Sequence, residues 1–170
     1  MTTPKTTFAG LALIAALCVA FTLGLTAPAW AGFEDGWAAY KRGDYATALR
    51  EWRPLAKQGN ANAQLFLGLM YRKGHGVPQD DAESVRWYRK AGEQGLASAQ
   101  RNLGIMYSQG RGVSQDFVQG YMWTDLAVSS YPPGMKRDEA VKNRDIVAKV
   151  MTPAQKSEAQ KLAREWEPKR

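Results

Sequence analysis

The apolar and polar positions in the central part of the chain follow one pattern twice. When residues 58–93 are aligned with residues 94–129, at an offset of 36, sixteen positions hold the same residue. The matches include small, aliphatic and aromatic positions, among them Ala63/Ala99, Leu67/Leu103 and Trp87/Trp123. A fixed period of this length is typical of repeat architectures, in which each repeat is one supersecondary unit. The chain therefore contains two copies of one unit.

The first half of each copy has the spacing of an amphipathic helix. In the first copy the repeated positions follow one another at steps of 4, 3, 1 and 3, and they are Ala63, Leu67, Met70, Tyr71 and Gly74. These steps keep the side chains on one face of a helix with 3.6 residues per turn. We predict that the first helices begin near Ala61 and Ala97.

The second half of each copy opens with a helix-start signal. Asp80 is followed three residues later by Glu83, and Asp116 is followed three residues later by Gln119. In such a capping box the aspartate oxygen accepts a hydrogen bond from a backbone N–H of the first turn, and the Glu or Gln side chain reaches back. We expect second helices that begin at these aspartates and lie antiparallel to the first.

The loops between these helices, GHGVPQDD from Gly74 and GRGVSQDF from Gly110, raise the question of a site. Two glycines around one residue could cradle a phosphate, and the first loop holds the only histidine of the chain. Because Arg111 stands where the first copy has His75, the repeat needs no imidazole there. A lone Gly-x-Gly without a preceding strand is weak evidence for phosphate binding. We predict that each helix ends at a left-handed glycine, and that His75 or Arg111 pairs with an acidic residue.

Degenerate forms of the unit flank the two complete copies. Upstream, residues 37–45 repeat the Tyr-x-x-Gly helix exit and the Asp cap without the loop, and they resemble a tetratricopeptide hairpin. Downstream, residues 131–134 break the helix, and a further helix is predicted from about 136 to 150. Thr152, Pro153 and Gln155 then give the start signal of a last helix.

These elements predict an all-α fold, a right-handed α-solenoid of about four stacked antiparallel hairpins. The expected units are 33–58, 59–94 and 95–130, followed by a C-terminal helical cap at 135–167. Atypical end units are expected of a solenoid, because terminal repeats cover a hydrophobic face with a polar one. We interpret Trp52, Trp87 and Trp123 as core residues between hairpins rather than as a stacking platform.

The first 31 residues have the pattern of a secretory signal peptide. Lys5 precedes an apolar run over 8–25, and residues 29–31 are Ala-Trp-Ala, with small residues at the −3 and −1 positions of a cleavage site. We predict a signal-peptide helix over 1–31, cleavage between Ala31 and Gly32, and a periplasmic or secreted protein without a membrane span. An uncleaved membrane anchor is the alternative, because about 18 apolar residues approach the length of a spanning helix.

Cleavage would remove the only cysteine, Cys18, and leave 170 − 31 = 139 residues. Disulfides, thiol nucleophiles and cysteine-bound metals are then excluded. Without Lys5, the 23 − 1 = 22 basic residues stand against 16 acidic ones, for a net charge of +6. In an exported protein this surplus favours an acidic protein, an anionic polysaccharide, cell-wall material or a lipid surface as partner, rather than nucleic acid. An ordinary basic surface is the alternative.

The repeated residues resemble the Sel-one-like repeat (SLR), a relative of the tetratricopeptide repeat. The resemblance rests on Ala-x-Ala-Gln-x-x-Leu-Gly-x-Met-Tyr-x-x-Gly-x-Gly-Val-x-Gln-Asp from Ala61 to Asp80, followed by Trp87 and Ala91. It covers roughly residues 59–130, and the segment 151–166 also looks like the closing helix of bacterial members. The resemblance implies an adaptor or scaffold for protein partners, often in bacterial envelope assembly or signalling. It implies neither a reaction nor a cofactor.

An enzyme is the competing class. Some cysteine-rich secreted SLR proteins bind or hydrolyse β-lactams, but residues 32–170 contain no cysteine and no Ser-x-x-Lys motif. With one histidine, no Ser-His-Asp set is predicted. The acidic pairs Glu34-Asp35 and Asp80-Asp81 lie at predicted helix starts. Their negative charge there interacts favourably with the positive end of the helix dipole, which gives them a structural role. We predict no catalytic or metal-binding residue; a cell-wall- or β-lactam-acting enzyme and an anionic polysaccharide-binding module are the alternatives.

Positions that differ between the two copies mark a candidate partner-binding surface, the variable stripe. On the first helices these positions are Asn62, Leu65, Phe66, Leu69 and Arg72 in one copy and Ser98, Arg101, Asn102, Ile105 and Ser108 in the other. Their steps of 3, 1, 3 and 3 place them together on one helix face. Because first helices line the concave side of stacked hairpins, we predict that the stripe binds a partner. The alternatives are exposed positions that are free to vary, and packing of Leu65 and Phe66 on the preceding hairpin.

Overall fold

The computed structural model describes residues 29–169, and its side chains are described from Gly32 onward. In this range the chain forms eight helices and no strand, so the all-α solenoid predicted from the sequence is confirmed. The helices are α1 (Ala29–Lys41), α2 (Tyr45–Lys57), α3 (Ala61–Lys73), α4 (Asp81–Glu93), α5 (Ala97–Gln109), α6 (Phe117–Ser130), α7 (Met135–Val150) and α8 (Pro153–Glu165). The predicted signal-peptide helix lies outside the described residues, apart from the first three residues of α1.

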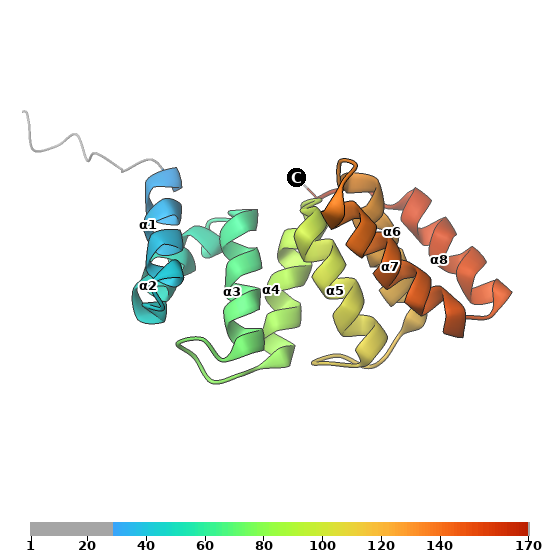
Figure 1. Ribbon diagram of the computed structural model, residues 1–170, viewed down its shortest axis with the longest axis horizontal. Coiled ribbons are helices and arrows are strands. Elements are labelled where there is room, and N and C mark those ends of the chain that lie inside the picture. The colour runs from blue at the N-terminus through green and yellow to red at the C-terminus, as the bar shows by residue number, and fades with distance from the viewer. Residues whose placement is uncertain (1–28, 170) are drawn as a thin grey trace, which may run out of the picture.

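The first six helices form three antiparallel hairpins stacked along the long axis of the molecule (Figure 1). Within the hairpins α1 packs on α2, α3 on α4 and α5 on α6. Between hairpins α2 packs on α3, and α4 packs on α5. Each hairpin therefore contacts its neighbours in the chain, as a solenoid requires.

Aspartate caps begin the second helices of all three hairpins. The side chains of Asp44, Asp80 and Asp116 accept hydrogen bonds from backbone N–H groups three residues later, at 2.9–3.1 Å. The predicted capping boxes at Asp80 and Asp116 are only half formed, since each has the aspartate bond without the return bond. At Asp80 the Glu83 carboxylate pairs with Arg86 at 3.1 Å instead. The complete box lies at Thr152 and Gln155, where both reciprocal hydrogen bonds are present.

A close contact between a glycine of the first helix and a fully buried side chain of the second recurs in each hairpin. The pairs are Gly36 with Trp52, Gly68 with Tyr88, and Gly104 with Thr124. A Cβ atom on any of these glycines would come closer to the partner than van der Waals contact allows. Glycine thus lets the two backbones approach while the facing side chain shrinks from Trp to Thr along the chain.

A buried glutamine links each hairpin of the repeat to the one before it. Nε2 of Gln64 donates to the carbonyl of Ala56 at 3.0 Å, and Nε2 of Gln100 donates to the carbonyl of Gly92 at 3.2 Å. Both glutamines are at most 4% exposed. Because a buried polar group is costly without a partner, these bonds fix the register between hairpins.

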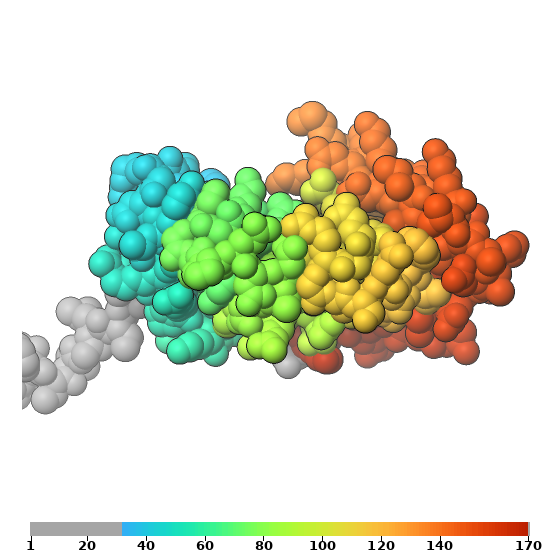
Figure 2. Space-filling model, turned by 90° about the horizontal axis from the view of Figure 1, so that it is seen from below, coloured from blue at the N-terminus to red at the C-terminus, as the bar shows by residue number. Residues whose placement is uncertain are grey.

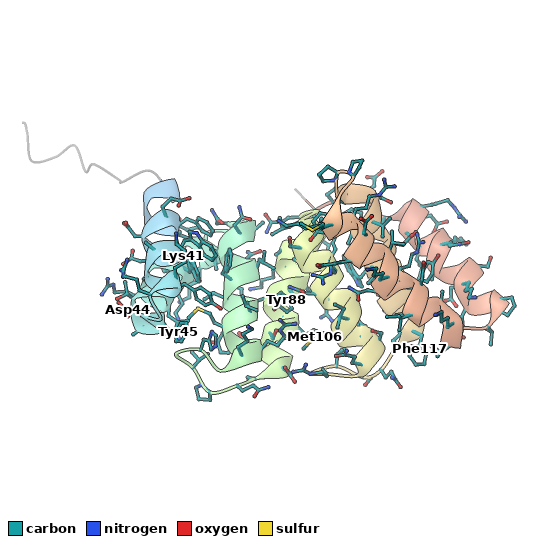
Figure 3. All side chains as sticks on the ribbon, in the orientation of Figure 1. Lys41, Asp44, Tyr45, Tyr88, Met106 and Phe117 are labelled. Atoms are coloured by element: carbon teal, nitrogen blue, oxygen red, sulfur yellow. The ribbon has the colours of Figure 1, made fainter. Side chains whose placement is uncertain are left out.

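The core consists of clusters at the junctions between hairpins. Trp52 lies in the first cluster with Leu67 and Met70, and Trp123 lies in the second with Tyr88 and Met106. Tyr88 and Met106 occupy the middle of the stack (Figure 3). Trp52 and Trp123 are buried and Trp87 is half-buried against the first cluster, which confirms their interpretation as core residues.

The C-terminal helices depart from the hairpin arrangement. Both α7 and α8 pack mainly on α6, and α7 crosses on the α5 side of it (Figure 1). Val147 and Met151 join Tyr121 and Ala159 in a further cluster. The segment after α8 returns to α4, where Lys169 donates its backbone N–H to the Glu93 carbonyl at 2.7 Å and its ammonium lies 3.0 Å from the Glu93 carboxylate.

Within residues 29–169, none of the helices combines the length and the apolar character that a membrane span needs.

Candidate partner-binding surface

The two glycine-flanked loops dock on the preceding hairpin. Gly76 of the first loop lies against Tyr45 and Leu49 at the start of α2. Gly112 of the second loop lies directly on the backbone of Asp81 at the start of α4. Both loops lie on the same edge of the molecule, side by side in Figure 2. Each loop therefore connects two helices and also holds two hairpins together.

The helix exits into these loops have the predicted left-handed geometry. Gly74 has φ of 68° and Gly110 has φ of 66°, and each donates its backbone N–H to carbonyls of the last turn. The loops are thus helix connections. Among the described residues no group of three or more His, Cys, Asp or Glu side chains lies close enough to hold a metal ion.

His75 makes aromatic contacts with the first hairpin. Its ring stacks on Tyr45 with centroids 4.2 Å apart and planes 16° apart. Its Nδ1 lies 3.2 Å from the Tyr40 hydroxyl, within hydrogen-bonding distance. Tyr45 lies at the start of α2, beside the loop (Figure 3). The histidine thus contacts tyrosines rather than an acidic residue.

Arg111 makes the predicted acidic pair. Its guanidinium donates twice to the Asp81 carboxylate, from Nε at 3.1 Å and from an Nη at 3.0 Å. This bidentate geometry is the strong form of an Arg–carboxylate contact. Tyr45 and Asp81 occupy equivalent positions, each the first residue of its helix after the aspartate cap. The repeat alone could have indicated that the two contacts are equivalent. Arg111 lies 36 residues after His75, and Asp81 lies 36 residues after Tyr45.

The structure divides the α3 half of the variable stripe. Asn62 is exposed, whereas Leu69 and Arg72 are half-buried. Leu65 packs against the second core cluster, which includes Val85 and Tyr88 of its own hairpin. Phe66 packs on the preceding hairpin, with its ring centroid 4.8 Å from that of Trp52, 5.2 Å from that of Trp37 and 5.8 Å from that of Phe33. The alternative that these two residues pack on the preceding hairpin is thus correct for Phe66, which is a core residue, and not for Leu65.

Two residues in the α5 half of the stripe are engaged by the C-terminal part of the chain. Ser98 accepts a hydrogen bond from the Tyr131 hydroxyl at 2.9 Å. Arg101 pairs with Glu139 of α7 at 2.9 Å. Asn102, which follows Arg101 in α5, is half-buried, as is Ile105 one turn later. Helix α7 therefore covers part of the predicted surface.

A pocket remains between α5 and α7. It has a volume of about 200 Å³ and is lined by Ile105, Ser108, Gln109, Asn143, Ile146 and Val147. Ile105 and Ser108 belong to the variable stripe, and Ser108 donates to the Ile105 carbonyl at 3.0 Å. The other wall comes from α7, which lies outside the repeat, so a comparison between copies could not identify it. We call the surface formed by α3, α5 and α7 the first-helix surface.

Arg72 lies on α3 as a cation without an acidic partner. Within residues 32–169 it forms no ion pair, and it stands close enough to Tyr40 to influence its ionisation. Burial raises the pKa of the Tyr40 hydroxyl and Tyr45 raises it further, while the positive charge of Arg72 lowers that pKa.

Comparisons with known proteins identify the repeat. A model of the Sel1 repeat matches residues 61–96 and 97–130. The chain is similar to a Sel1 repeat protein from Oxalobacter formigenes, with 32% identity and a TM-score of 0.60 over 70% of this chain and 89% of that one. It is also similar to a protective antigen of uropathogenic Escherichia coli strains that displays an SLR fold, with 31% identity and a TM-score of 0.75 over 82% of this chain. It spans 30% of that antigen's length. A comparison with curated proteins found no match.

The chain belongs to the Sel1-like repeat family, as its repeated residues indicated. Its two matched repeats correspond to the hairpins α3–α4 and α5–α6. The fold is that of a protein-interaction scaffold built from stacked helix pairs.

Proposed function

We propose that this protein is an exported, non-catalytic scaffold that binds a partner protein of the cell envelope on its first-helix surface. The observation that carries the proposal is the pocket between α5 and α7. It combines apolar walls, from Ile105, Ile146 and Val147, with polar groups of Ser108, Gln109 and Asn143. Such a combination suits an extended or helical peptide segment, whose side chains fill an apolar pocket while polar groups fix its orientation.

Charge supports an anionic partner. Within residues 32–169 Arg72 forms no ion pair, and the chain without its first 31 residues has a net charge of +6, from 22 basic and 16 acidic residues. Exposed charges attract over roughly 8–10 Å at ordinary ionic strength. Binding that involves Arg72 should therefore weaken as salt is added.

The proposed location is the periplasm or the exterior, after cleavage between Ala31 and Gly32. It is supported by the pattern of residues 1–31. Mass spectrometry of the protein isolated from its native envelope should find Gly32 at the N-terminus. An intact Met1 in the membrane fraction would contradict this part of the proposal.

Binding can be tested by affinity capture from an envelope extract with three matched baits. The native chain should retain one or a few proteins that Ile105→Glu loses, because a carboxylate would stand in the pocket. Ser129→Glu, on the exposed end of α6, introduces the same charge away from the pocket and should retain them. Equal capture by all three baits would contradict the assignment of the surface.

A turnover assay separates the scaffold from an enzyme. The purified protein is incubated with β-lactams and with peptidoglycan, and the products are followed by chromatography. No hydrolysis is expected. Hydrolysis that Ile105→Glu leaves unchanged would replace the scaffold with an enzyme that acts elsewhere on the molecule.

A further inference from the structure

One face of α7 carries the large hydrophobic side chains that are exposed in residues 32–169. The large hydrophobic side chains that are exposed there are Met135 at 84%, Ile146 at 62% and Val150 at 61%. All three belong to α7, whose opposite side buries Ala140 and Val147. Met135 and Ile146 are 11 residues apart, about 16 Å along the helix, so this face has an apolar group at each end.

The order of residues along this face is apolar, acidic, basic and apolar. Met135, Glu139, Lys142 and Ile146 follow at steps of 4, 3 and 4, which place them in one stripe along the helix. Beside Met135, Tyr131 and the two prolines that follow it line a hollow of about 310 Å³. We call Met135, Glu139, Lys142 and Ile146 the α7 stripe.

The α7 stripe is complementary to itself in an antiparallel arrangement. In a two-fold pair of α7 helices centred between residues 140 and 141, Met135 of each copy lies at the level of Ile146 of the other. In the same register Glu139 of each copy faces Lys142 of the other. Val150 then reaches the hollow at Tyr131. Apolar groups thus meet apolar groups, and each carboxylate meets an ammonium.

We propose that this protein forms a two-fold symmetric homodimer through antiparallel contact of the α7 stripes. A second copy is favoured over a different partner because reversing the helix places Lys142 of one copy opposite Glu139 of the other, and the reverse. The interface consists of a single helix on each side, so the dimer dissociates on dilution. The α7 stripe and the pocket share Ile146, but self-association is measured without any other protein, so its failure is distinguishable from a failure of the proposed partner binding.

The first test is sedimentation velocity of the full-length protein over a wide range of concentrations. The native chain should shift from monomer to dimer as its concentration rises, and Met135→Glu should remain monomeric. Lys57→Glu, an exposed position on α2, is the control with an added negative charge and should dimerise like the native chain. Circular dichroism should show the same helical content in all variants. A native chain that stays monomeric at every concentration would overturn the proposal.

A charge exchange tests the register. Glu139→Lys alone and Lys142→Glu alone should each dimerise less, because like charges then face one another. The double variant should regain the dimer, and an equal mixture of the two single variants should form a heterodimer. Loss of Glu139 also removes its pair with Arg101, but that loss within one chain cannot make a mixture associate. A mixture that does not associate would overturn the register proposed.

Cross-linking gives a second, covalent test. Cysteines at 135 and 146 in one chain, in a Cys18→Ser background, stand 11 residues apart and thus about 16 Å along the helix. That distance is too long for a disulfide within the chain, so mild oxidation should give a covalent dimer. Cysteines at 136 and 146, of which the first points to another side of the helix, should cross-link far less. Equal cross-linking of both pairs would contradict the proposed interface.

Discussion

The junction between the first and second hairpins and the junction between the second and third use the same backbone geometry with different side-chain chemistry. At both, a glycine-flanked loop docks on the start of the preceding second helix. At the first junction the contact is a stack of His75 on Tyr45, and at the second it is the ion pair of Arg111 with Asp81. Apart from Trp123–Trp166, the aromatic pairs of residues 32–169 lie within the first hairpin or at its junction with the second.

This difference shows which parts of the repeat are fixed by geometry. The glycines, the aspartate cap and the buried glutamine are the same in both copies, because they satisfy backbone groups or allow close approach. The residue between the glycines and its contact on the preceding helix are free to change, provided that they change together. The junctions should therefore respond differently to mutation, salt and pH.

The largest effect is expected from the centre of the first junction. Trp52 is fully buried, and its indole N–H donates to the Phe33 carbonyl at 3.1 Å. Trp52→Ala should lower the free energy of unfolding by about 3–5 kcal/mol, as large-to-small changes in a core do. Urea unfolding followed by circular dichroism measures the loss. Trp37→Ala, at a half-buried position of the same aromatic group, is the control and should cost less.

The docking of the loops predicts a graded series of glycine substitutions. Gly43, Gly76 and Gly112 all have positive φ, at 79°, 71° and 66°, so alanine is strained at each by about 1–2 kcal/mol. A Cβ atom at Gly43 meets nothing within 4 Å, one at Gly76 comes 2.9 Å from the Tyr45 Cβ, and one at Gly112 overlaps the Asp81 backbone. Overpacking should add about 1–3 kcal/mol.

Thermal unfolding should therefore rank Gly112→Ala as the least stable of the three variants and Gly43→Ala as the most stable. Equal losses at all three positions would show that the loops do not dock as described.

Alkaline pH should lower the stability of the fold through Tyr88 but not through Trp52, which occupies the equivalent position in the preceding hairpin. Burial raises the pKa of Tyr88 from its ordinary value of 10.0 to about 12. The folded state then holds this proton over a pH range in which the unfolded chain has lost it. The stability linked to Tyr88 is complete below pH 10 and decreases as the pH rises toward 12, by up to about 3 kcal/mol, since one pKa unit corresponds to about 1.4 kcal/mol.

Tyr88→Phe should remove this part of the alkaline loss, whereas Trp52→Phe should leave the pH dependence unchanged. Urea unfolding at a series of pH values between neutrality and pH 12 provides the comparison. Identical pH profiles for the native chain and Tyr88→Phe would contradict the assignment.

The smallest effect on stability is expected when the Arg111–Asp81 ion pair of the second junction is replaced by the histidine–tyrosine contact of the first. Arg111→His should lose about 0.2–1 kcal/mol, because the ion pair with Asp81 is partly exposed. The double variant Asp81→Tyr/Arg111→His copies the first junction into the second, and the stability of the two single variants and the double variant defines a coupling energy. We expect partial recovery in the double variant and a loss of salt dependence at that junction. Additive losses would show that the two positions are not coupled.

The fold was predictable because the sequence pattern of each helix in the repeat occurs twice, at an offset of 36 residues. The helix starts at Ala61 and Ala97 and the exits at Gly74 and Gly110 agree with the structure, since each depends on local backbone chemistry. The second half of the capping box at Asp80 was not predictable, because Glu83 has a competing partner in Arg86 on its own helix.

The candidate surface was predictable only in part. Differences between copies identified Ile105 and Ser108, which line the pocket, but they also identified Phe66, which differs because the first junction is aromatic and the second is not. A position can vary because it contacts a variable neighbour. The α7 wall, with Ile146, lies outside the repeat and had no second copy for comparison.

The docking loops give the stack a fixed order of units. The loop of each unit contacts the start of the second helix in the unit before it, so a unit fits only a predecessor with a suitable first helical residue. A tandem duplication of residues 59–94 would place the His75 of the new copy against the Asp81 of the old one. A carboxylate favours the charged form of an imidazole that faces it, so this contact is strongest where the imidazole is protonated. Lengthening this solenoid by one unit would thus introduce a junction that is stronger in mild acid than at neutral pH.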